Sequence, residues 1–69
     1  MKYLVIYEAT PTGYSAYVPD LPGCITTGRT LEETERLMKE AVEFHLEGLR
    51  EDGLPIPEAT TRADYITAA

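Results

Sequence analysis

The chain has 69 residues and is acidic, with 12 Asp and Glu against 6 Lys and Arg, one cysteine and one histidine. Such a chain forms one small domain that buries only about 60% of its unfolded surface, and its net charge of −6 argues against direct binding to a nucleic-acid backbone. A single cysteine excludes an intrachain disulfide, and the lack of a Cys/His cluster argues against a zinc site. We therefore expect a cytoplasmic protein without metal or cofactor, stabilised as a homodimer or homotetramer.

Three short strands are predicted in the first 27 residues. Residues 2–8 are rich in aromatic and β-branched side chains and are apolar on both faces, which is typical of a central strand. Residues 10–13 (Thr-Pro-Thr-Gly) predict a turn, so residues 14–18 return antiparallel. Residues 20–23 (Asp-Leu-Pro-Gly) predict a second reversal before a third strand at residues 24–27.

One long helix follows from residue 31 to about residue 52. Thr30 is a suitable N-cap, Glu33 can close a capping box onto the Thr30 N–H, and Gly53 is a suitable left-handed C-cap. The apolar residues cover an arc of roughly 200°, wider than one sheet requires. We therefore expect one flank, near Leu37 and Phe44 or near Leu46, to meet something besides its own sheet.

The remaining residues complete an α+β pattern. Residues 52–57 form a Gly/Pro-containing connector that cannot be helical, and residues 63–68 predict a last strand. The order is β-β-β-α-β, with the helix on one face of a mostly antiparallel sheet and the fourth strand parallel to its neighbour. The opposite face is left uncovered, which favours a protein partner.

Three segments together resemble the N-terminal domain of the HicB antitoxin family. They are Gly-Tyr-Ser-Ala-Tyr-Val-Pro-Asp-Leu-Pro-Gly-Cys at 13–24, Thr-Gly-Arg-Thr-Leu-Glu-Glu at 27–33 and Glu-Asp-Gly-Leu-Pro-Ile-Pro at 51–57. The resemblance implies a truncated ribonuclease-H-like fold. It also implies a HicB-like antitoxin of a type II toxin–antitoxin system, which binds and neutralises a small basic HicA-type toxin that cleaves mRNA. Residues 1–69 are expected to be a single HicB-like domain without the C-terminal DNA-binding module that longer members carry.

Two other functions have to be weighed against this one. The first is a stand-alone oligomeric domain without a toxin partner, either a degenerate antitoxin or a ligand-binding module. The second is a nuclease, which would require several carboxylates converging on metal ions. The middle of the first strand, Leu4 to Ile6, lacks an acid, and only Glu8, Asp64 and a helix glutamate remain. We therefore expect no enzymatic activity and no catalytic residue.

The candidate residues fall into two groups. Those expected at a partner or oligomer interface are Tyr7, Tyr14, Tyr17, Asp20, Leu37, Phe44 and His45. Those expected to shape the backbone or the caps are Pro19, Pro22, Gly23, Cys24, Gly28, Thr30, Glu33 and Gly53.

Some of these residues have competing roles. Asp20 could contact a partner, but reversal chemistry is the favoured interpretation of its motif. Tyr14 and Tyr17 should face opposite sides of the sheet, so only one is a candidate interface anchor. Cys24 is expected to be a buried, inert thiol, and His45 is expected to be a packed or interface residue rather than a catalyst.

Overall fold

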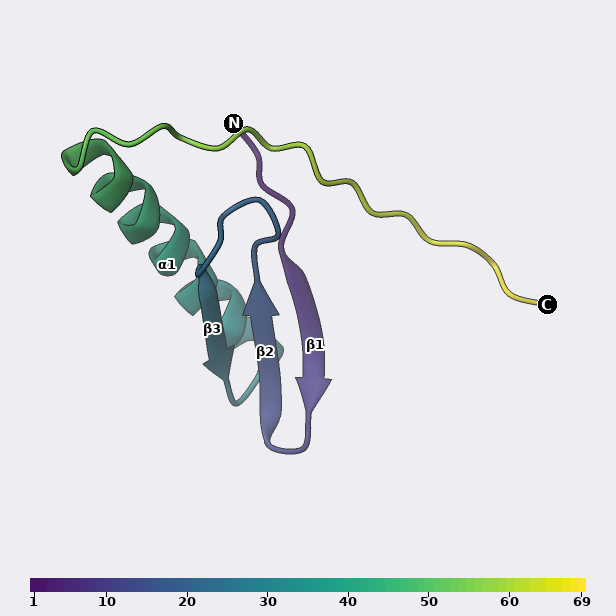
Figure 1. Cartoon of the computed structure of the whole chain (residues 1–69). Helices are drawn as coiled ribbons and strands as arrows, with labels where there is room; N and C mark the ends of the chain where they lie inside the picture. Colours follow the sequence, from purple (N-terminus) through teal and green to yellow (C-terminus); the bar gives the residue numbers. More distant parts are fainter.

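A computed structural model describes all 69 residues and shows a three-stranded antiparallel sheet with one helix on one face (Figure 1). The elements are β1 (Ile6–Thr10), β2 (Gly13–Tyr17), β3 (Ile25–Gly28) and α1 (Leu31–Glu51). The sheet order is β1-β2-β3. The predicted α+β class, with one helix covering one sheet face, is confirmed.

The first strand begins later than predicted and lies at an edge. β1 pairs with β2 from Ile6 opposite Tyr17 to Thr10 opposite Gly13, so the hairpin turn is Pro11-Thr12. After Tyr17 the chain enters a loop in which the Val18 N–H donates to the Cys24 carbonyl. Residues 2–5 therefore have no partner strand, and the central strand is β2 rather than the predicted first strand.

The loop between β2 and β3 supplies much of the core. Besides the Val18–Cys24 bond, the Leu21 N–H donates to the Val18 carbonyl and the Cys24 N–H donates to the Leu21 carbonyl. Gly23 takes a positive φ of 84°, as the predicted reversal requires. The buried apolar core consists of Ala16, Val18, Leu21, Cys24 and Met38.

Both ends of the helix lie where the sequence predicts them, but one hydrogen bond of the predicted capping box has a different donor. The Thr30 side chain accepts a hydrogen bond from the Glu33 N–H at 3.1 Å, but the Glu33 carboxylate accepts from the Arg29 N–H rather than from Thr30. At the other end Gly53 has a φ of 67° and donates to the Arg50 carbonyl, and the Leu54 N–H donates to the Leu49 carbonyl. These two bonds form a Schellman cap, which stops the helix where predicted.

The helix does not cover the whole sheet. α1 packs against β3 and β2 and leaves β1 beyond its edge (Figure 1). It passes close to the end of β3, where a Cβ on Gly28 would collide with the Thr34 hydroxyl. The lateral offset opens one hollow beside β3 and another between β1 and the opposite flank of α1.

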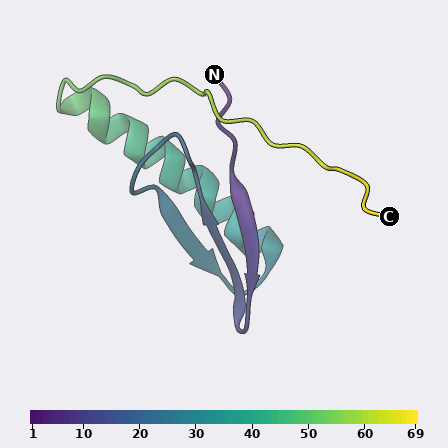
Figure 2. The same ribbon diagram turned by 45° about the vertical axis from the view of Figure 1, so that its right-hand side comes forward.

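The predicted fourth strand is absent from this chain. Residues 54–69 have no regular structure, and the segment leaves the domain beyond β1 in both views (Figures 1 and 2). The prediction for residues 63–68 is wrong for the isolated chain because a strand exists only through pairing with a neighbour, and none lies beside it. α1 also lacks an apolar stretch long enough to cross a membrane.

Candidate protein-binding surface

The uncovered face of the sheet carries a row of three apolar side chains. Ile6, Tyr17 and Ile25 stand opposite one another on β1, β2 and β3. Ala16, the neighbour of Tyr17, is buried toward α1, so Tyr17 points to the other face. Tyr17 is 39% exposed and Ile25 is 65% exposed, so the row is open to a partner.

The row continues around the edge of β3 onto the helix. Ile25 also borders a hollow of about 470 Å³ on the helix side, together with Phe44, His45 and Leu49. Phe44 is 79% exposed although it is the only phenylalanine of the chain. We refer to Tyr17, Ile25, Phe44, His45 and Leu49 as the β3-edge patch. β3 itself is an edge strand, so its outer backbone groups are unpaired.

The β3-edge patch is bordered by carboxylates. Asp52 lines the same hollow, and Glu40, Glu47 and Glu51 lie on the exposed helix surface, close to Phe44 by helical spacing. Glu40 is paired with Arg36 at 3.2 Å, which leaves the other carboxylates without a basic partner. An exposed aromatic residue with an acidic border matches a partner that is apolar at its centre and basic around it.

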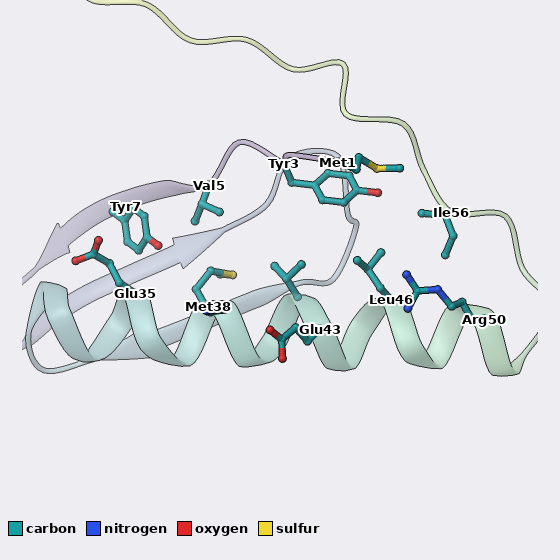
Figure 3. A pocket seen from close by; sticks show the side chains of 12 residues that line it. Met1, Tyr3, Val5, Tyr7, Glu35, Met38, Glu43, Leu46, Arg50 and Ile56 are labelled. Carbon is teal, nitrogen blue, oxygen red and sulfur yellow. The ribbon is translucent and has the colours of Figure 1, made fainter.

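A second apolar surface lies on the other flank of α1. A groove of about 460 Å³ runs between the N-terminal segment and the helix; its apolar lining includes Val5, Tyr7, Val42 and Leu46 (Figure 3). Tyr7 points into this groove toward Glu35. Burial, and then the Glu35 charge, raise the pKa of the Tyr7 hydroxyl. Tyr7 therefore belongs to the helix side of the sheet and not to the open face.

Asp20 is engaged within its own chain. Its carboxylate accepts hydrogen bonds from the backbone N–H groups of Thr60 and Thr61 at 3.0 and 2.9 Å, and from both hydroxyls. These bonds, with those of Thr61 strongest, lower the pKa of the Asp20 carboxyl. Asp20 thus holds the C-terminal segment to the β2–β3 loop. Asp20 and Thr60 are 40 residues apart in sequence, and the reversal motif does not predict this contact.

The remaining candidates are placed as follows. Tyr14 is half-buried near the hairpin end, beside Gly28 and Arg29, and is not part of the β3-edge patch. Leu37 is half-buried on α1. Pro19 and Pro22 flank the buried Leu21 in the β2–β3 loop. Cys24 is a buried free thiol, and burial raises its pKa, as expected for an unreactive cysteine.

Ile25 and Leu49 were not among the sequence candidates. Ile25 was assigned to a short strand, and only the register that sets it opposite Tyr17 reveals its place in the row. Leu49 falls within the apolar arc of the helix, and the arc alone does not tell which of its residues face away from the sheet. The clue available in the sequence is the excess width of that arc, which indicates a free flank either near Leu37 and Phe44 or near Leu46.

The acidic side chains considered for metal-dependent cleavage do not lie close together. Glu8 is exposed on β1 and Asp64 is exposed on the C-terminal segment, where it accepts a bond from the Tyr65 N–H. Across all 69 residues no three His, Cys, Asp or Glu side chains form a group able to hold a metal ion.

Comparison with known proteins gives concordant results. Residues 3–69 match the family model of the HicB-like antitoxin of bacterial toxin–antitoxin systems. An uncharacterized 14.9 kDa protein of Haemophilus phage HP1 is 41% identical over 96% of this chain, which spans 50% of that protein. Antitoxin HicB 2 of Photorhabdus laumondii is 31% identical over 93% of this chain and 46% of its own length.

A solved structure agrees with these sequence matches. A chain of the HicA3 and HicB3 toxin–antitoxin complex superposes with a TM-score of 0.74 and 30% identity, covering 87% of this chain and 70% of that one. The present chain thus spans about half the length of the curated relatives described above. The chain belongs to the HicB-like antitoxin family.

Proposed function

We propose that this chain neutralises a small basic HicA-type toxin that cleaves mRNA, by binding it as a non-enzymatic cytoplasmic antitoxin. The observation that carries the proposal is the exposed Phe44 within the β3-edge patch, next to unpaired helix carboxylates. The relationship to a HicA3–HicB3 complex supports the same class of partner.

The charge distribution supports a basic protein rather than RNA as the ligand. Residues 31–52 hold eight acids and three bases, so most of the net charge of −6 lies on the helix. These charges would repel a phosphate backbone and would steer a basic protein toward the same surface. By covering the basic surface of the toxin, the chain would keep RNA from binding there.

Co-expression tests the proposal. The chain is produced together with a toxin of the HicA type encoded beside it, and growth and co-purification are recorded. We expect growth arrest by the toxin to be relieved and the two proteins to co-purify. Continued arrest despite abundant folded chain, with no co-purification, would favour the stand-alone oligomeric domain instead.

A further inference from the structure

The backbone of β3 directs its hydrogen-bonding groups alternately toward β2 and away from it. In an antiparallel pair, every second residue exchanges hydrogen bonds with the neighbouring strand, and the residues between them point their N–H and C=O groups outward. The Val18 N–H donates to the Cys24 carbonyl, and the β2–β3 register continues from this bond. Because the pattern repeats every two residues, the backbone groups of Thr26 and Gly28 also face β2.

Ile25 and Thr27 therefore direct their backbone N–H and C=O groups to the outside of the sheet. β3 is the last strand on its side of the sheet (Figure 1), and both residues are exposed. No backbone hydrogen bond of a loop, turn or cap engages either residue. An edge with regularly spaced free donors and acceptors can pair with a strand of another chain.

A strand added at this edge would find apolar contacts on both of its faces. Its side chains would alternate between the open face of the sheet and the helix side. On the open face the neighbouring side chain is Ile25, which is 65% exposed. On the helix side it is Phe44, which is 79% exposed and borders the hollow of about 470 Å³ together with His45.

The charges beside this edge select a basic strand. Asp52 lines the hollow itself, and Glu40 and Glu47 lie about one helical turn on either side of Phe44. A basic side chain on the helix side of the added strand would meet these carboxylates. A second copy of this chain would bring the same carboxylates to the same edge and would be repelled.

The opposite edge of the sheet does not make this selection. The groove beside β1 is lined by two acidic and two basic side chains, which are Glu35, Glu43, Lys39 and Arg50. Its charges balance, so it does not favour a basic partner over an acidic one.

We propose that an extended strand of the basic partner pairs with the outer edge of β3 through the backbone groups of Ile25 and Thr27. This strand carries a basic side chain on the helix side and an apolar side chain over Ile25. The inference rests on the proposed function and names the element by which the toxin is held. The main-chain hydrogen bonds supply affinity, and the alternating side chains supply specificity.

Amide hydrogen exchange followed by NMR tests this pairing on the native chain, alone and in complex with the HicA-type toxin encoded beside it. The amides of Ile25 and Thr27 should exchange fast in the free chain and at least roughly a hundredfold more slowly in the complex. The amides of Thr26 and Gly28 should be protected in both states, because they face β2.

A substitution pair at Thr27 supplies the second measurement. Thr27→Pro removes the outward N–H without removing a bond to β2, and Thr27→Ala shortens the same side chain but keeps the N–H. Circular dichroism should show both variants folded. The proline variant should bind the toxin about tenfold or more weakly than the alanine variant, because an acceptor of the toxin loses its donor.

The outcomes separate this proposal from the proposed function. A complex in which the Ile25 and Thr27 amides still exchange fast would overturn the strand pairing and leave neutralisation of the toxin in place. Equal toxin affinities of folded Thr27→Pro and Thr27→Ala would do the same. Protection of the two amides at high concentration of the chain alone would identify a second copy as the occupant and would also overturn the pairing. Absence of any complex would overturn both proposals.

Discussion

Gly28 is a point of close approach between the sheet and the helix. A Cβ added there would collide with the Thr34 hydroxyl and would lie 3.1 Å from the Thr34 backbone nitrogen. Thr34 is itself fully buried, and its hydroxyl donates to the Thr30 carbonyl at 2.7 Å. Because both backbone and side chain are fixed, neither can move aside for a methyl group.

Gly28→Ala should therefore destabilise the chain by about 1–3 kcal/mol through overpacking. Gly48→Ala is the matched control, because Gly48 lies inside α1 and a Cβ there meets nothing within 4 Å. It should raise the free energy of unfolding by about 0.5–1 kcal/mol through helix propensity. Urea unfolding monitored by circular dichroism measures both. Equal effects of the two substitutions would contradict the close approach at Gly28.

Asp20 makes the position of the C-terminal segment dependent on pH. Its folded-state pKa lies below the ordinary value because Thr61 and Thr60 donate to the carboxylate. A depressed pKa means that the attachment contributes fully above the unfolded-state pKa, near 3.9, and is lost as the pH falls through the lower folded-state value.

The amide protons of Thr60 and Thr61 should report this loss. Their NMR shifts should stay constant from neutral pH to about pH 4 and move upfield together below it. Asp20→Asn should move the Thr60 and Thr61 amide signals upfield already at neutral pH. Asp64→Asn should leave them unchanged, because the exposed Asp64 carboxylate accepts a hydrogen bond only from its neighbour Tyr65. Threonine shifts that are insensitive to both pH and Asp20→Asn would rule out the attachment.

At the scale of the elements, α1 is held to the sheet mainly through one buried row. Met38 is 1% exposed and packs with Ala16, Leu21 and the other core residues. On either side of this row the helix flanks are only half-buried, which is why the apolar arc in the sequence is wider than the contact it makes with the sheet.

Met38→Ala should consequently lower the free energy of unfolding by about 2–5 kcal/mol, because it removes the centre of the only core. Leu31→Ala, at an exposed position of the same helix, is the control and should cost less than about 1 kcal/mol. Thermal unfolding compares the two. A Met38→Ala variant as stable as Leu31→Ala would show that α1 is anchored elsewhere.

The elements that depend on local signals were predictable. Thr30, Gly53 and Gly23 act through backbone geometry within a few residues, so the helix ends and the second reversal followed from the sequence. The edge position of the first strand did not follow from the sequence, because residues 2–8 are apolar on both faces. Tyr7 faces the groove beside α1, whereas Ile6 belongs to the row on the open face. The Asp20–Thr61 contact joins distant residues, and no local pattern encodes it.

At the scale of the whole molecule, two opposite edges of one small sheet have different characters. The β3 edge is apolar at its centre and acidic at its border, whereas the groove beside β1 has a mostly apolar lining that includes charges of both signs. The first suits the basic protein partner proposed above.

Phe44→Ala should weaken toxin binding by about 2 kcal/mol or more, since exposed aromatic residues at the centre of an interface carry much of its energy. The fold should be unaffected because the side chain is 79% exposed. Leu31→Ala, in the first turn of α1 and outside the β3-edge patch, should bind as the native chain does. Calorimetric titration of the toxin with each variant measures the two affinities. Equal affinities would show that the toxin does not bind at the β3-edge patch.

The central claim is that this chain acts by covering a basic RNA-cleaving protein, and an RNA-cleavage assay tests it most directly. Purified HicA-type toxin is incubated with a labelled mRNA and increasing amounts of the native chain. Cleavage should fall in proportion to added chain and stop at a fixed molar ratio. Undiminished cleavage at a large excess of folded chain would contradict the claim.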